Sequence, residues 1–281
     1  MRALGLLALG FVALAPAPHA ALTGPPGVTP FERGHNAIVL AVRLNGRGPF
    51  RLLLDTGSTH TSVSPKTAEA LAAPVVAKAP MGSAAGSRMT LVVRISSLEV
   101  GPVSVNGLLA SVIDLGEIPD VDRIDGVIGH DALGTLGYAI DFRRRHVVWF
   151  PTDAMAARAS SLELEPSGGR FLLALPQRDS LLRLVPDTGA ASLLLFAPHD
   201  ALPVTRLPVF ATLTTMSGVT EVRTATLREL RVGALTLRDV PAVVTDRDRS
   251  EPADVDGLLP LHLFDRVTVD GPGKRLIVEK I

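Results

Sequence analysis

Two copies of the tripeptide Asp-Thr-Gly carry the residues best suited to chemistry. Asp55-Thr56-Gly57-Ser58 follows the apolar run Leu52–Leu54, and Asp187-Thr188-Gly189-Ala190 follows Leu184–Pro186. Burying an unpaired carboxylate is costly, so an acid at the end of an apolar strand needs a partner. If the two loops meet, each Asp is the partner of the other. Two carboxylates a few ångströms apart share one proton, which places a base and an acid side by side.

Such a pair can hydrolyse a carbonyl compound. The ionised carboxylate takes a proton from a bound water, and the protonated one polarises or protonates the substrate carbonyl. Gly57 allows a tight turn and close backbone approach. Thr56 offers a hydroxyl that can bond across an interface, and Ser58 offers a second hydroxyl near Asp55. This chemistry requires neither a metal nor a covalent intermediate, which suits a chain without cysteine.

The two tripeptides belong to an internal repeat. Asp187 lies 187 − 55 = 132 residues after Asp55. Chance would produce a given tripeptide of this kind on the order of 0.1 times in such a chain. The same offset relates Gly86 to Gly218, Gly101 to Gly233 and Asp114 to Asp246, and an offset of 131 (256 − 125) relates Asp125-Gly-Val-Ile-Gly129 to Asp256-Gly-Leu-Leu-Pro260. We therefore expect two lobes that arose by duplication.

Each half is predicted to be mostly strand, with few short helices. The expected strands lie at 37–44, 50–54, 91–95, 98–100, 103–105, 108–113, 171–175 and 181–185, with turns between them. Ser64–Ala73 carries a cap and an early proline, so it predicts a helix, and His130–Leu136 predicts a second one. The less regular stretch 151–169 is the expected linker.

The chain resembles aspartic peptidases of the pepsin and retropepsin group over residues 31–281. The resemblance rests on the two Asp-Thr-Gly motifs, on the apolar-apolar-Gly segment that ends at Gly129 and, more weakly, on its counterpart that ends at Pro260. The resemblance implies an all-β fold of two pseudo-symmetric β-barrel lobes with a few short helices. It places the N-terminal lobe at 31–150, the linker at 151–169 and the C-terminal lobe at 170–281. It further implies an endopeptidase, a peptide or protein substrate, and a monomer with both lobes in one chain.

The resemblance also assigns roles to residues. Asp55 and Asp187 would be the catalytic pair, Thr56 and Thr188 would cross-bond the loops beneath it, and Ser58 would hydrogen-bond the outer oxygen of Asp55. Gly57, Gly189 and Ala190 would complete the loops. The family covers its substrate with a flap hairpin, one in pepsin and two in retropepsin dimers, and both numbers stay open here. The candidate flap positions are Gly82, Ser83 and Gly86 in one lobe and Ser217 and Gly218 in the other.

Three departures from the family pattern affect the second lobe or the flap. Pro186 removes a backbone donor directly before Asp187, Pro260 replaces a glycine, and Tyr138, the one tyrosine, lies outside the flap. Two alternatives to an active peptidase therefore stay open. One is an inactive peptide-binding module on the same fold, and the other is a lobe pair that the Asp-Thr-Gly loops merely hold together.

Charge and motif content narrow the remaining classes of partner and site. The formal net charge is zero and no basic stripe is present, so we expect no nucleic-acid partner. The seven histidines lack metal-ligand spacing, and neither a His-Glu-x-x-His nor a Gly-x-Ser-x-Gly motif occurs. We accordingly expect no metal and no cofactor.

The N-terminus is typical of a targeting segment. Arg2 precedes the apolar run Ala3–Ala15, and small residues and prolines follow. This pattern predicts a signal peptide over residues 1–20, with an uncleaved N-terminal anchor as the alternative. We expect an exported protein, periplasmic in a Gram-negative bacterium, without a stable membrane span after cleavage.

Overall fold

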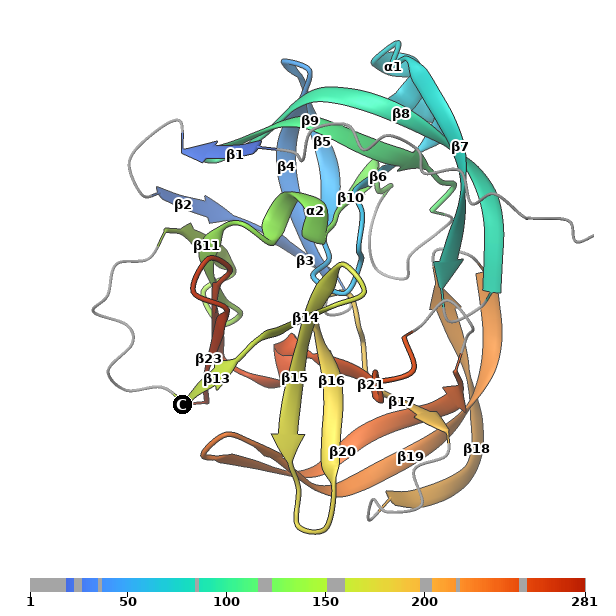
Figure 1. The fold of residues 1–281 in the computed structure, drawn as a ribbon, viewed down its shortest axis with the longest axis vertical. Helices are drawn as coiled ribbons and strands as arrows, with labels where there is room; N and C mark the ends of the chain where they lie inside the picture. The colour runs from blue at the N-terminus through green and yellow to red at the C-terminus, as the bar shows by residue number, and fades with distance from the viewer. Residues whose placement is uncertain are drawn as a thin grey trace, which may run out of the picture.

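Three β-sheets and very little helix make up the protein, as the computed structural model in Figure 1 shows. The predicted all-β class is thus confirmed. The structure describes residues 19–22, 27–34, 37–83, 86–115, 123–150, 160–197, 204–215, 218–247 and 252–280. Most of the predicted signal peptide lies outside these ranges. Its last residues, from His19, belong to β1 (His19–Leu22), which pairs with the strand at 103–112.

A nine-stranded sheet forms the lobe that carries Asp55. Its strand order is β1-β9-β6-β10-β5-β4-β8-β7, β3 pairs with β4, and β8 and β9 pair along most of their length. The bounds are β3 (Glu32–Gly34), β4 (Ala37–Leu44), β5 (Arg47–Leu54), β6 (Ser62–Val63), β7 (Val75–Ser83), β8 (Gly86–Val100), β9 (Val103–Val112) and β10 (Gly126–Ile128). Two helices accompany it, α1 (Pro65–Ala70) and α2 (His130–Leu133).

An eight-stranded sheet forms the lobe that carries Asp187, in the order β14-β15-β16-β21-β17-β20-β19-β18. The bounds are β14 (Glu165–Ser167), β15 (Arg170–Pro176), β16 (Leu181–Asp187), β17 (Leu193–Ala197), β18 (Val204–Thr215), β19 (Gly218–Val232), β20 (Leu235–Asp246) and β21 (Gly257–Pro260). The short 3₁₀ helix η2 (Leu261–Leu263) follows β21 as α2 follows β10.

A six-stranded sheet joins the lobes, in the order β13-β23-β22-β11-β12-β2. At its centre β11 pairs with β22, so a strand of one lobe bonds directly to a strand of the other. Trp149 and Tyr138 are fully buried beside this junction, and the Trp149 indole donates to Thr29 at 2.9 Å. The bounds are β2 (Gly27–Pro30), β11 (Gly137–Asp141), β12 (His146–Trp149), β13 (Ser160–Glu163), β22 (Arg266–Asp270) and β23 (Arg275–Glu279).

The repeat found in the sequence is also a repeat of strands. β8 spans 86–100 and β19 spans 218–232, so both ends are offset by 132 (218 − 86 and 232 − 100). The turns that follow hold Gly101 at φ +54° and Gly233 at φ +60°, a backbone conformation that favours glycine. The pairs β9 and β20 begin at the same offset (235 − 103). Both lobes therefore place their strands alike.

Local signals in the sequence explain the helix starts better than the strand lengths. Ser64 caps α1, its hydroxyl accepting from the Thr67 N–H at 3.1 Å, and Pro65 takes the first turn. The turn predicted between Leu91–Ile95 and Leu98–Val100 is wrong, because β8 runs unbroken through both. β9 likewise joins the two strands predicted at 103–113. Pairing on both sides keeps these long strands continuous.

Part of the predicted linker is regular structure. Residues 151–159 lie outside the described ranges, but 160–167 form β13 and β14. β13 pairs with β23 in the joining sheet, and β14 pairs with β15 of the second lobe. Backbone hydrogen bonds to strands distant in sequence thus impose order on a stretch that its composition describes as irregular.

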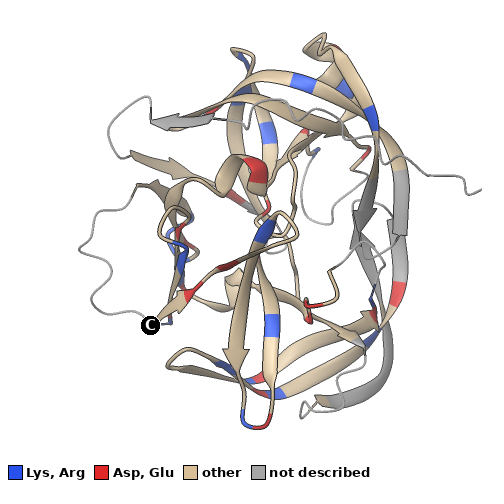
Figure 2. Cartoon of the chain, viewed as in Figure 1, with Lys and Arg blue, Asp and Glu red and all other residues tan. Residues whose placement is uncertain are grey.

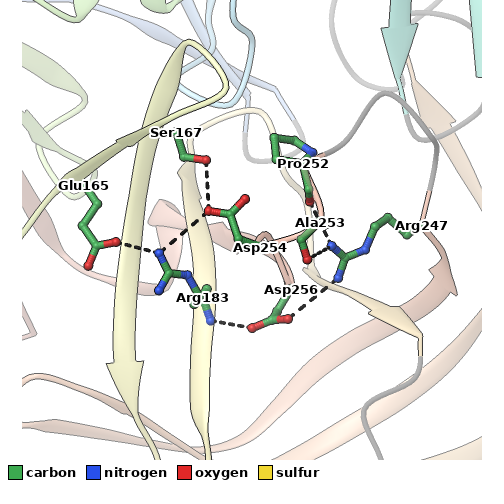
Figure 3. Close-up of polar contacts among 8 residues, drawn as sticks. All are labelled: Glu165, Ser167, Arg183, Arg247, Pro252, Ala253, Asp254 and Asp256. Carbon is green, nitrogen blue, oxygen red and sulfur yellow. Dashed lines mark hydrogen bonds and ion pairs between the residues drawn. The ribbon is translucent and has the colours of Figure 1, made fainter.

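In each lobe, an aspartate side chain accepts a hydrogen bond from the backbone N–H of an arginine. This bond holds the apolar segment that follows the aspartate. The Asp125 carboxylate accepts from the Arg51 N–H at 2.9 Å, and the Asp256 carboxylate accepts from the Arg183 N–H at 2.8 Å. In the second lobe these residues belong to a wider polar network, drawn in Figure 3, in which Arg183 also pairs with Glu165 at 2.7 Å. The network ties β21 to β16, the strand that ends in Asp187.

Candidate active site

Asp55 and Asp187 meet between the lobes. Asp187 is the last residue of β16, and Asp55 directly follows β5. Each of these strands runs parallel to the apolar-apolar-Gly strand of its own lobe, β5 beside β10 and β16 beside β21. The two carboxyl groups lie close enough for each to shift the pKa of the other. The structure therefore brings together the two acids that the repeat predicted to be partners.

Four hydrogen bonds beneath the acids lock the two loops together. The Thr56 hydroxyl donates to the Pro186 carbonyl at 2.8 Å and accepts from the Thr188 N–H at 3.1 Å. The Thr188 hydroxyl donates to the Leu54 carbonyl at 2.6 Å and accepts from the Thr56 N–H at 3.0 Å. Both threonines are buried. The cross-bonding expected from the resemblance is thus present.

The glycine of each loop lies against the acid of the other. A Cβ atom on Gly57 would stand 2.4 Å from Asp187 Cγ, and one on Gly189 would stand 3.0 Å from Asp55 Cγ. These glycines also donate backbone N–H groups, Gly57 to Asp55 Oδ1 at 2.9 Å and Gly189 to Asp187 Oδ1 at 2.6 Å. Any side chain at either position would push the acids apart.

The two acids differ in how their surroundings shift the pKa of each carboxyl. Burial raises the pKa of Asp187 well above its usual range, and the negative charge of Asp55 raises it further. Burial also raises the pKa of Asp55, but hydrogen bonds from Asp187 and from the Gly57 and Ser58 N–H groups oppose this rise. In the mechanism proposed below, Asp187 therefore carries the shared proton and Asp55 carries the negative charge.

Comparison with known proteins agrees with this geometry. A family model described as aspartyl protease matches residues 40–132 and 178–262, which together exceed half of the chain and include both Asp-Thr-Gly loops. The chain belongs to this family. Among solved structures, the aspartic proteinase from Irpex lacteus is similar at a TM-score of 0.53 and 14% identity, over 91% of this chain and 97% of that chain. A search of curated protein sequences found no significant match.

The acids stand at the ends of two equivalent strands, as the sequence indicated, but Ser58 differs from expectation. Its hydroxyl donates to the His60 carbonyl at 3.0 Å, and it is the Ser58 backbone N–H that reaches Asp55, at 3.1 Å. The predicted side-chain contact is therefore wrong. The loop turns so that the main chain, and not the hydroxyl, meets the carboxylate.

Pro186 does not disturb the position of its neighbour Asp187. The pairing between β15 and β16 ends at Leu184, two residues before Pro186. Pro186 continues the register with β21, opposite Leu259, and its carbonyl accepts the Thr56 hydroxyl. Pro260 lies opposite Asp187 in the same register. Neither proline turns the second acid away.

The predicted flaps coincide with two hairpins. β7 and β8 pair out to Ser83 opposite Gly86, and β18 and β19 pair out to Thr215 opposite Gly218. These end pairs are again 132 residues apart (215 − 83 and 218 − 86). Gly82 lies within β7, and Ser217 lies outside the described residues. In Figure 1 both hairpins extend along the same side of the molecule.

Sequence reasoning missed Arg170, which lies in the same site. This residue opens β15 of the second lobe, is 8% exposed, and donates from Nη1 to the Gly57 carbonyl at 2.9 Å. Its positive charge lowers the pKa of both Asp55 and Asp187. The sequence places it next to two glycines at a presumed linker, so its pattern is that of a solvated turn.

Features of other site classes were sought in the described part of the chain. There, no group of three or more His, Asp or Glu side chains is arranged to hold a metal ion. No described helix is both long and apolar enough to cross a membrane. Acidic and basic positions are interspersed over both lobes in the view of Figure 2. The Asp55–Asp187 pair is the site on which we base a function.

The raised pKa of Asp187 gives a testable dependence of stability on pH. A carboxyl whose pKa is higher in the folded than in the unfolded chain favours folding at low pH, and this contribution is lost as pH rises through the folded pKa. The unfolding free energy should therefore fall as pH rises from about 4, the ordinary carboxyl value, through the pKa of Asp187. Urea unfolding across this range measures the slope.

Asp187→Asn should make this slope shallower, because the variant has no proton to lose at that position. The exposed residue Asp179 offers a matched control, and Asp179→Asn should leave the slope unchanged. Equal slopes in wild type and Asp187→Asn would contradict the assignment of the shared proton.

Proposed function

We propose that this aspartyl protease is an exported endopeptidase that hydrolyses peptide bonds with the Asp55–Asp187 dyad. The observation that carries the proposal is the meeting of the Asp187 carboxyl, which is buried, and the Asp55 carboxyl, which is half-buried, on two cross-bonded loops. The family match supports hydrolase chemistry on peptides. Export rests on the N-terminal sequence pattern.

The unequal protonation of the dyad gives each acid a role. The Asp55 carboxylate takes a proton from a water as the water oxygen attacks the scissile carbonyl carbon. Asp187 gives its proton to the carbonyl oxygen, which avoids an oxyanion in a buried site. The tetrahedral intermediate then breaks its C–N bond, the amine nitrogen takes a proton from Asp55, and Asp187 regains a proton as the carboxylic acid product forms.

The backbone supports these roles. Two N–H groups, from Gly57 and Ser58, donate to Asp55 Oδ1 at 2.9 and 3.1 Å and stabilise its negative charge. The threonine cross-bonds hold the two loops at fixed separation, so the dyad is set before substrate binds. The β7–β8 and β18–β19 hairpins are the elements that would close over a bound peptide.

A peptide library provides the direct test. The purified protein should cleave internal peptide bonds, and pepstatin, which mimics the tetrahedral intermediate, should block cleavage. The absence of cleavage from acid to neutral pH would instead favour the peptide-binding module. Export is tested by fractionating cells that express the full chain. Recovery of the protein in the cytoplasmic fraction would contradict export.

A further inference from the structure

The turn between β14 and β15 of the second lobe lies on the Asp55 loop of the first. Three consecutive residues make the contact. A Cβ on Gly169 would stand 3.7 Å from Thr59, Arg170 donates to the Gly57 carbonyl at 2.9 Å, and the Phe171 ring meets the His130 ring edge-on at 4.4 Å between centroids. Figure 1 shows this yellow-green turn beside α2, between the lobes.

Arg170 binds the carbonyl group of Gly57, the residue of the Asp55 loop that lies next to both acids. Gly57 donates its N–H to Asp55, its Cα lies against the Asp187 carboxyl, and its carbonyl accepts from Arg170. A guanidinium keeps its charge at every working pH, and burying that charge is costly unless negative groups lie near. The dyad supplies such a negative charge, and Arg170 attracts both of its carboxyls.

We propose that Arg170 is a positioning residue of the dyad, whose buried guanidinium sets the pH range in which the peptidase works. The inference rests on the proposed function, since it concerns the same site. It extends that function by assigning a regulating charge to a residue of the opposite lobe, 113 positions from the carbonyl that it binds.

The other charged groups around Arg170 do not replace this effect. His130 of α2 lies near Arg170. Burial and the Arg170 charge lower the pKa of His130 to about 4, so its ring is neutral at higher pH. Asp131 of α2 is bonded to the Thr61 N–H at 2.9 Å, and His60 is exposed beside Thr59. Asp55 and Asp187 are the carboxyl groups of the site whose pKa values the Arg170 charge lowers.

The direction of the effect follows from the sign of the charge. A cation near two carboxyls lowers the pKa of both, so the singly protonated dyad is populated at lower pH. Removal of the cation raises both values. Both limbs of the bell-shaped profile of kcat/KM against pH should then move to higher pH together.

The experiment measures this profile in four variants. Arg170→Met should move both limbs upward by about one pH unit. Arg170→Gln should move them equally although it keeps a donor for the Gly57 carbonyl, and it serves alone if Arg170→Met does not fold. Arg170→Lys should restore most of the wild-type profile. Arg238→Met, on the exposed face of β20, is the matched control and should change nothing.

Unchanged limbs in Arg170→Met and Arg170→Gln would overturn the proposal, as would an equal displacement in Arg170→Lys. A second measurement is independent of cleavage. Carbon-13 shifts of the Asp55 and Asp187 carboxyls, followed by NMR from about pH 3 to about pH 8, should show both titrations displaced upward in Arg170→Gln. If wild type cleaves no peptide, the proposed function fails, and this titration still decides the role of Arg170.

Discussion

Replacing Asp187 with asparagine is expected to lower kcat by about ten-thousandfold and to leave the fold intact. Asparagine fills the same space but has no carboxylic proton to give to the carbonyl oxygen. Asp55→Asn should cause a similar loss, because no carboxylate then remains to take the proton of the attacking water. Single-turnover cleavage of a reporter peptide measures both.

The control for this prediction is Asp179→Asn, an exposed aspartate of the β15–β16 turn, which should keep full activity. Circular dichroism and the unfolding midpoint would show that each inactive variant is folded. Substantial cleavage by either purified Asp→Asn variant would remove that residue from the chemistry and return the site to the peptide-binding alternative.

Thr188→Val should destabilise the protein by about 2–4 kcal/mol. Valine has the shape of threonine, but it leaves the buried Leu54 carbonyl and the Thr56 N–H without their shared partner. An unpaired buried polar group costs about 1–3 kcal/mol, and Thr188→Val leaves two such groups unpaired. The same change should lower kcat/KM about a hundredfold, since the loops that space the acids are no longer fixed. Urea unfolding and peptide cleavage measure the two effects.

Thr188→Ser is the matched variant, because it keeps the hydroxyl and loses only a methyl group. It should cost about 1 kcal/mol and retain most activity. If serine and valine proved equally damaging, packing of the methyl group, and not the cross-bonds, would account for the role of Thr188.

The sequence alone predicted the Asp55–Asp187 pair because the same motif occurs twice in the chain. Asp55 and Asp187 head identical tripeptides behind apolar strands, and a constant offset of 132 (187 − 55) also predicted equivalent hairpins. Lone motifs of this length would have been poor evidence, as they are common in turns. The two-lobed architecture followed from the repeat, and the family match agrees with it.

What escaped prediction depends on contacts between distant segments. Arg170 follows two glycines, and nothing in its neighbourhood signals a bond to Gly57 of the other lobe. The Ser58 hydroxyl had two acceptors within reach, and the geometry of the loop selects the His60 carbonyl. β13 exists because β23 lies beside it, more than a hundred residues later in the chain. Such choices are made by tertiary structure, where local propensity is weak.

The contact of Arg170 with the Asp55 loop has a consequence for how a substrate would lie. A dyad with true two-fold symmetry presents the same surroundings to a peptide threaded in either direction. Here the side near Asp55 carries a buried cation and two backbone donors, whereas Asp187 receives one such donor among the described residues. The two ends of a bound chain therefore meet different surroundings, and the site has a built-in polarity from amino to carboxyl end.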